Sequence, residues 1–220
     1  MKTVGLAFSR ASRERERRVR QAQYKFKGTP LPKDGNPQEQ SDWHNVNAPD
    51  DVKVGHTVHE LGHIIALRES GIGHEGMILG THPNPRGDGV VHGMTLLPSS
   101  MFLPDGTLNP EHLAAFIDFT VSGAAAEKEI LGQDSEGMQS DLMFATTELT
   151  KAGYTSEQIK DYVNKSYERQ REVFRRPSIK REFENAVPFL AQNHHVGKLV
   201  RRDMVDKCLA GTFRQSKEEQ

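Results

Sequence analysis

Apolar residues in one stretch of the chain are spaced as on one face of an α-helix. They occupy the first, fifth, eighth and twelfth positions of this stretch: Val54, Val58, Leu61 and Ile65. This spacing places the four side chains on a single face that can be buried against other elements. With Gly71 as a suitable residue to end it, the pattern predicts a helix over residues 52–70.

Two short runs of β-prone residues follow, at 77–80 and 90–97. A stretch rich in Pro, Asn and Gly separates them, so together they predict a β-hairpin with a long loop. The hairpin is expected to form a small sheet beside the first helix. An edge of such a sheet can bind an extended peptide through main-chain hydrogen bonds, or the sheet can simply cover the core. The sequence leaves both roles open.

The second half of the chain carries helix signals. An Asn-Pro-Glu sequence is a strong helix start and opens a helix expected over 109–131. Further helices are expected over 140–152 and over 155–209. The second of these starts with a capping box formed by Thr155 and Gln158 and has breaks near Pro177 and His194. The chain is therefore predicted to adopt a mainly-α fold with a small β-hairpin or sheet.

Composition indicates a soluble globular protein, because 35% of the 220 residues are hydrophobic and 27% are charged. The apolar stretches are interrupted well short of the run of about 20 residues needed to cross a bilayer, so no membrane span is expected. Cys208 is the single cysteine, which excludes an internal disulfide framework and fits a reducing compartment. A cytoplasmic location is therefore expected.

Charge is distributed unevenly, although the net charge is only −1. Residues 1–27 hold nine Lys or Arg against two acids, and residues 28–50 are polar and rich in Pro and Gly. We therefore expect a basic N-terminal arm and linker over 1–50, one folded domain over 51–211 and a polar tail over 212–220. The arm is suited to contact nucleic acid, an acidic partner or a neighbouring subunit, or it is a solvated segment without a partner.

The most informative motif is the pentapeptide His-Glu-Leu-Gly-His inside the first predicted helix. Residues four apart share a helix face, so His59 and His63 can bind one zinc ion while Glu60 reaches a water on that ion. Gly62 costs a helix about 1 kcal/mol relative to Ala, which suggests close approach of another segment at this point. In its helical context the motif predicts a zinc-dependent hydrolase. The alternative is a chance pair of histidines on a helix.

A hydrolytic zinc site needs a third protein ligand and one open position. Glu69 is a poor candidate, because the zinc peptidases with a ligand at this spacing turn the chain at a glycine where this chain has Ala66. His56 lies on the same rigid helix, which gives awkward tetrahedral geometry. A carboxylate from a later helix is the better choice.

Two later segments are in register with a known family. Residues 123–132 read GAAAEKEILG, and residues 136–146 read EGMQSDLMFAT. Together with the motif helix and the hairpin, they make the chain resemble the peptidase domain of the FtsH-like ATP-dependent zinc metalloproteases, whose segments read GRAAEExxxG and TGASNDLxxAT. The resemblance covers roughly residues 54–209. It implies a zincin-type helical peptidase domain, zinc as the cofactor and Asp141 as the third ligand, although Ala124 replaces an Arg of the family.

With these three ligands, the chemistry of a hydrolytic zinc site gives each candidate site residue a role. His59, His63 and Asp141 are expected to hold the zinc ion, and Glu60 to take a proton from the attacking water and pass it to the leaving amine. Glu127 is a candidate for orienting a metal-bound imidazole, or else it is a solvated helix position. Three further histidines near the hairpin are candidates for stabilising the oxyanion, and nothing in the sequence selects among them: His74, His82 and His92.

The expected function is that of a zinc metalloendopeptidase acting on unfolded or flexible protein segments. No GxxxxGK[ST] phosphate-binding loop occurs in these residues, so they contain no ATPase to unfold a substrate. Because the family forms hexameric rings, a homo-oligomer is a further expectation. The alternative is a catalytically silent FtsH-like zinc protein that binds a partner or acts as a nucleic-acid-associated regulator through the basic arm. The intact Glu60 favours the enzyme.

Overall fold

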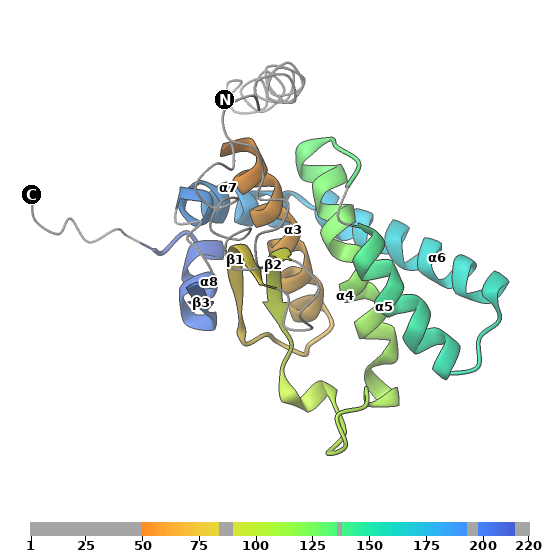
Figure 1. Ribbon diagram of the computed structural model, residues 1–220. Coiled ribbons are helices and arrows are strands. Elements are labelled where there is room, and N and C mark those ends of the chain that lie inside the picture. Colours follow the sequence, from red (N-terminus) through yellow and green to blue (C-terminus); the bar gives the residue numbers. More distant parts are fainter. Residues whose placement is uncertain (1–49, 84–89, 136–137, 193–197, 214–220) are drawn as a thin grey trace, which may run out of the picture.

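The computed structural model describes residues 50–83, 90–135, 138–192 and 198–213. They form a mainly helical structure with a small three-stranded antiparallel sheet (Figure 1), which confirms the expected fold class. The expected N-terminal arm and linker, and most of the polar tail, lie outside the described residues, as does the expected break near His194.

The predicted motif helix is α3, Asp50–Glu69. Its apolar stripe points into the protein, and Val58, Leu61 and Ile65 are fully buried. Gly71 follows the helix with a φ angle of 72°, a left-handed conformation that glycine adopts without strain. Helix α3 lies between the sheet and helix α4 (Figure 1). Side chains of the sheet and of α4 can therefore contact the pentapeptide.

The sheet has β1, Gly76–Pro83, in its centre, with β2, Val90–Leu96, and β3, Lys198–Arg201, on either side. Strands β1 and β2 form the predicted hairpin, in which Met77 pairs with Thr95. The strand order β2-β1-β3 places β2 at one edge of the sheet, and β2 contacts α3.

Strand β3 corrects the expectation of helical structure over 155–209. Val200 of β3 pairs with Met77 on the side of β1 that β2 leaves open. The pairing joins segments far apart in the chain, and such a partner leaves no local signal in the sequence. The helical signal after it is correct, because α8, Arg202–Leu209, follows immediately.

The single helix expected over 109–131 is divided into three parts. Asn109 caps a short 3-10 turn, Pro110–His112, with its side-chain oxygen. Helix α4, Leu113–Ala126, follows and passes directly into a wider π-helical turn, Glu127–Leu131. A π-turn shifts the side chains after it relative to a regular helix. Here it begins at Glu127, one of the candidate site residues.

The remaining helices agree with the predicted starts. Thr155 and Gln158 form the predicted capping box, and the chain breaks between two helices at Pro177. Helix α5 and the long helix α6 pack against α4, and α7 packs against α3 (Figure 1). The bounds of these helices are Met138–Lys151 for α5, Ser156–Arg175 for α6 and Pro177–Gln192 for α7.

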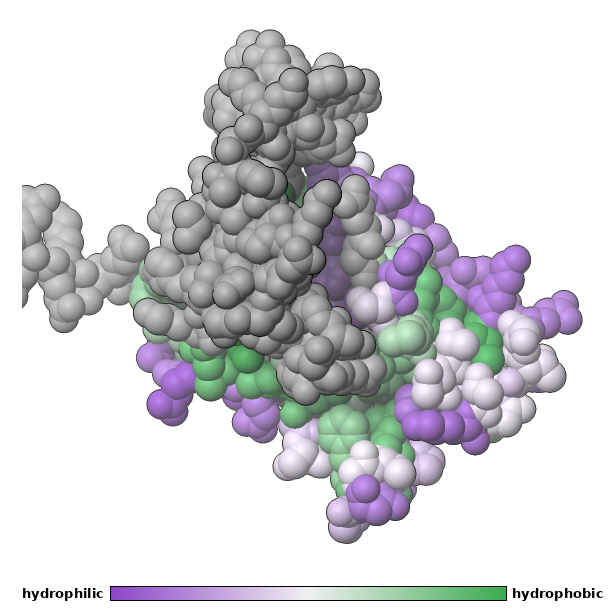
Figure 2. All heavy atoms as spheres, viewed as in Figure 1, coloured by the Kyte–Doolittle hydropathy of each residue, from purple (hydrophilic) through white to green (hydrophobic). Residues whose placement is uncertain are grey.

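The buried side chains form two groups. One lies among α3, the sheet, α7 and α8, and the other among α4, α5 and α6, with Tyr167 packed against both. Ile159 and Val163 of α6 face inward, whereas hydrophilic side chains gather over the outer end of that helix at the right of Figure 2. Within the described residues, none of the helices combines the length and the apolar character needed to cross a membrane.

Candidate active site

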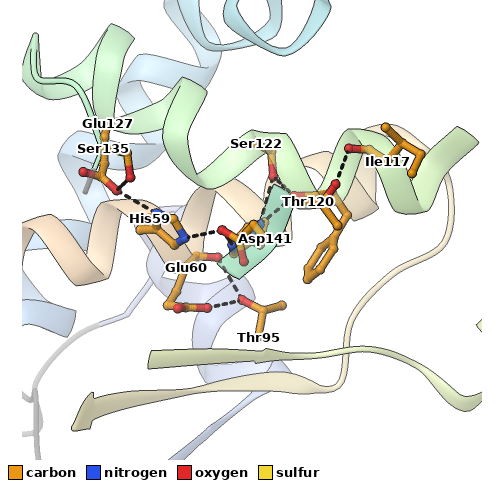
Figure 3. Close-up of polar contacts among 11 residues, drawn as sticks. His59, Glu60, Thr95, Ile117, Thr120, Ser122, Glu127, Ser135 and Asp141 are labelled. Atoms are coloured by element: carbon orange, nitrogen blue, oxygen red, sulfur yellow. Dashed lines mark hydrogen bonds and ion pairs between the residues drawn. The ribbon is translucent and has the colours of Figure 1, made fainter. Parts of the chain in front are cut away.

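The two histidines of the pentapeptide meet the carboxylate of Asp141 at the junction of α3, α4 and α5. The Oδ2 atom of Asp141 lies 3.0 Å from Nε2 of His59 and 3.6 Å from Nε2 of His63 (Figure 3). One donor atom from each of the three side chains lies within 4.8 Å of the others. The structure thus brings together the three residues that the sequence singled out as metal ligands.

The spacing of these donor atoms suits a small divalent metal ion. A tetrahedral zinc ion with bonds of about 2.0–2.2 Å holds its donor atoms about 3.3–3.6 Å apart. The separations of 3.0 and 3.6 Å from Asp141 Oδ2 to the two imidazoles are close to this range, and the two imidazole donor atoms lie within 4.8 Å of each other. Two imidazole nitrogens and one carboxylate oxygen also form a donor set typical of hydrolytic zinc sites. The residues present therefore fit such an ion.

His59 is held from its other nitrogen by Glu127. Nδ1 of His59 donates to Oε1 of Glu127 over 2.6 Å, and Ser135 donates its hydroxyl to the same oxygen over 2.8 Å (Figure 3). Glu127 is the first residue of the π-turn, and from this position its side chain contacts His59. A carboxylate bonded to Nδ1 fixes the tautomer and the ring orientation, so that Nε2 faces the candidate metal position.

His63 is held by the main chain of α4. Its Nδ1 donates to the carbonyl oxygen of Phe119 over 2.7 Å, and the hydroxyl of Ser122 lies 3.2 Å from the same nitrogen. The ring of Phe119 packs against the imidazole at 4.5 Å between centroids. These contacts again leave Nε2 directed at Asp141. The sequence carries no signal for them, because they depend on how α3 and α4 pack.

Two glycines allow α3 and α4 to approach closely enough for these contacts. A Cβ atom on Gly62 would lie 2.7 Å from both the carbonyl oxygen of Ser122 and the Cβ of Ala126. A Cβ atom on Gly123 would lie 2.5 Å from the imidazole of His59. Neither position tolerates a side chain without movement, so the close approach inferred from Gly62 is confirmed.

Glu60 lies on the side of α3 that faces the sheet. It is only 6% exposed, and Oγ1 of Thr95 on β2 donates to its Oε2 over 2.8 Å. Burial raises the pKa of Glu60 to about 7, against the opposing effects of His59 and of the Thr95 hydrogen bond. A carboxyl group with a pKa near neutrality can both accept and release a proton, as a general base that later acts as an acid must do.

The two histidines differ in charge. Burial disfavours the charged form of His59, but its hydrogen bonds with Asp141 and Glu127 outweigh this and raise its pKa to about 10. Burial lowers the pKa of His63 to about 4, so its imidazole is neutral near pH 7. A metal cation beside Asp141 would take the position of the proton on His59 Nε2, and it would find the lone pair of His63 available.

Two further candidates from the sequence, Glu69 and His74, are not part of this group. Glu69 pairs with Arg176. His74 is buried and lies 3.2 Å from Asp206 on α8, so its Nε2 is engaged outside the candidate site. The side chains of His82 and His92 lie outside the part of the chain that the structure describes.

Comparison with known proteins does not assign the chain to a family. No protein-family model matches the sequence, and no curated protein matches it. The resemblance to FtsH-like peptidases therefore rests on the sequence segments described above. The geometry of the site provides an independent line of argument about function.

Proposed function

We propose that this protein is a zinc-dependent endopeptidase that hydrolyses peptide bonds in unfolded or flexible protein segments. The observation that carries the proposal is the meeting of His59, His63 and Asp141, with donor atoms within 4.8 Å of one another. A helical His pair alone also occurs by chance. Metal-assisted hydrolysis requires a third ligand and a general base. Here Asp141 from a separate helix provides the third ligand, and the buried Glu60 lies next to the first.

The zinc ion, when bound, would polarise a carbonyl and lower the pKa of a water from 15.7 to about 7. A side chain of the protein carries out the proton transfers. Glu60, with a pKa raised to about 7, accepts the proton from the attacking water and then donates it to the leaving amine. Since Glu60 is buried, bulk water does not compete strongly for that proton.

Glu127 supports this chemistry through His59. The hydrogen bond of 2.6 Å between them holds the imidazole in one orientation, and Ser135 holds the carboxylate in turn. Partners of this kind raise the basicity of a histidine ligand and strengthen metal binding. Glu127 is thus proposed to position a ligand without contacting the substrate.

The substrate class follows from the need to bring a main-chain carbonyl to the water that Glu60 would deprotonate. A peptide bond inside folded structure is not free to enter such a site, so unfolded or flexible segments are the proposed substrates. The segments shared with FtsH-like peptidases point to the same class. The single cysteine, Cys208, supports a reducing compartment, and we propose the cytoplasm.

Cleavage of casein, an unfolded model protein, tests the proposal. The wild-type protein and the Glu60→Gln variant are compared on gels, and zinc is measured in both samples. We expect zinc in both and cleavage by the wild type alone. Glu69→Gln, on the same helix but paired with Arg176, is the matched control and is expected to cleave. Zinc in both proteins with cleavage in neither would favour the alternative of a catalytically silent zinc protein that binds a partner.

A further inference from the structure

The carboxylate of Glu60 is held by two residues of strand β2. Thr95 and Gly93 are two positions apart, so they face the same side of the strand, and that side faces α3. Thr95 is 7% exposed and donates its hydroxyl to Glu60 Oε2 over 2.8 Å (Figure 3). The proposed general base is therefore tied to the sheet as well as to its own helix.

Gly93 leaves free the space that the other oxygen of the same carboxylate occupies. A Cβ atom on Gly93 would lie 2.5 Å from Oε1 of Glu60 and 2.9 Å from its Cγ. The backbone of Gly93 does not have a positive φ, so glycine is not required there by conformation. What requires glycine is the carboxylate itself. The two oxygens of Glu60 thus have different surroundings, one hydrogen-bonded to Thr95 and one packed against main chain.

The Thr95 hydroxyl has a choice of acceptors. Its oxygen lies 2.8 Å from Glu60 Oε2 and 3.1 Å from the main-chain oxygen of Glu60. A hydroxyl has one proton, and a helical carbonyl is already bonded to the main-chain N–H four residues on. The ionised carboxylate is the stronger acceptor. The proton of Thr95 is therefore best placed on the carboxylate.

We propose that Thr95 is the positioning residue of the general base, and that Gly93 provides the space in which the Glu60 carboxylate sits. This inference rests on the proposed peptidase function, in which Thr95 and Gly93 orient the carboxylate of the general base, Glu60. Strand β2 is fixed by its register with β1, in which Thr95 pairs with Met77, so the orientation of Glu60 is set by the sheet. Both hydrogen bonds of the Thr95 hydroxyl within the described residues are made to Glu60, so Thr95 is proposed to act through Glu60.

Three variants test this inference in the zinc-loaded protein. Thr95→Val removes the hydroxyl and keeps the shape of the side chain. We expect kcat for casein-derived peptides to fall about ten- to a hundredfold, the effect of losing one hydrogen bond to a charged group, with KM and zinc content unchanged. Thr95→Ser restores the hydroxyl and is expected to recover most of kcat. Thr120→Val removes a buried hydroxyl that donates to the main-chain oxygen of Ile117, and is expected to keep wild-type kcat.

Gly93→Ala tests the packing half of the inference. The added Cβ would meet the flexible end of Glu60, so we expect the carboxylate to move while the protein stays folded. The expected result is again a lower kcat at constant KM. Wild-type kcat in both Thr95→Val and Gly93→Ala would overturn the inference. A higher kcat in Thr95→Val would also overturn the inference, because the hydrogen bond from Thr95 would then hold the Glu60 carboxylate in a less active orientation.

A double-mutant cycle on stability tests the contact without using activity. The shift in urea midpoint caused by Thr95→Val is measured in the wild-type background and in the Glu60→Ala background. We expect a clearly smaller shift when the Glu60 side chain is absent, because the hydroxyl has then already lost its carboxylate acceptor and keeps only the main-chain oxygen of residue 60. Equal shifts in the two backgrounds would overturn the inference. Unequal shifts in a protein that cleaves nothing would instead overturn the proposed function and leave the contact supported.

Discussion

Asp141 Oδ2 lies 3.0 Å from His59 Nε2, although the two residues are 82 positions apart in the chain. Helix α5 carries Asp141 in its first turn, and α3 carries His59 in its middle. The position of a carboxylate between two imidazoles is therefore a property of how three helices pack. It is the feature that turns a helical histidine pair into a candidate site for a metal ion.

Removing Asp141 is expected to abolish stoichiometric zinc binding. Asp141→Ala leaves two imidazoles, one ligand fewer than a hydrolytic zinc site needs. The measurement is zinc content by mass spectrometry after dialysis against a weak chelator. Asp161→Ala, which removes an exposed carboxylate paired with Lys165 on α6, is the matched control and is expected to keep its zinc. Equal zinc in Asp141→Ala and wild type would exclude Asp141 as a ligand.

Glu127→Gln is expected to weaken zinc binding without abolishing it. The carboxylate that orients His59 becomes a neutral amide, and loss of such a partner typically costs about 10- to 100-fold in metal affinity. Competition with a zinc-binding dye gives the dissociation constant. Glu129→Gln serves as the control, because Glu129 is two residues away and pairs with Arg171 and Arg175. If both variants bind zinc as the wild type does, Glu127 does not orient His59.

Gly62→Ala is expected to destabilise the protein, although alanine is the better helix former by about 1 kcal/mol. The added methyl group would lie 2.7 Å from Ser122 O and from Ala126 Cβ, so α3 and α4 must separate. Overpacking of this kind costs about 1–3 kcal/mol. Urea denaturation measures the change in the free energy of unfolding. A more stable Gly62→Ala protein would show that the two helices are not as close as described.

The stability of the chelator-treated protein is expected to depend on the charge of Glu60. Its folded pKa of about 7 lies above the ordinary value of 4.5, so the folded state favours the protonated form. The cost of ionising Glu60 is absent below about pH 4.5, grows as the pH rises, and is complete above about pH 7, where it reaches about 3 kcal/mol. Glu60→Gln, which stays neutral, should therefore be more stable than the wild type at pH 8 and not at pH 4.

Urea denaturation at a series of pH values measures this difference. Glu129→Gln is an opposite control, because the hydrogen bonds of Glu129 with Arg175 and Arg171 overcome its burial and lower its pKa. This variant should lose stability relative to the wild type at pH 8. A Glu60→Gln protein that gains no stability between pH 4 and pH 8 would contradict the raised pKa of Glu60.

The parts of the fold that local sequence patterns could predict are those with local causes. The spacing of Val58, Leu61 and Ile65 predicts α3 because a buried helix face repeats every three or four residues. The capping box at Thr155 predicts the start of α6 for a similarly local reason. Strand β3 was missed because its partner, β1, is more than a hundred positions earlier in the chain.

The candidate site divides in the same way. His59, Glu60 and His63 follow from one pentapeptide, because helix geometry alone places the imidazoles on one face. Asp141 could be identified only because residues 136–146 match a second segment of the FtsH-like peptidases. Thr95, Phe119 and Ser122 could not be predicted, because their contacts come from the packing of β2 and α4 against α3. The π-turn that begins at Glu127 has no established signature in a single sequence.

The most direct test of the account is a zinc titration of the chelator-treated protein in which binding and casein cleavage are followed together. The account predicts that cleavage by the wild type rises in proportion to bound zinc and saturates at one zinc per chain. Glu60→Gln should bind the same single zinc and cleave nothing. Cleavage that is independent of zinc, or equal cleavage by Glu60→Gln, would contradict the central claim that His59, His63 and Asp141 hold a catalytic metal ion served by Glu60.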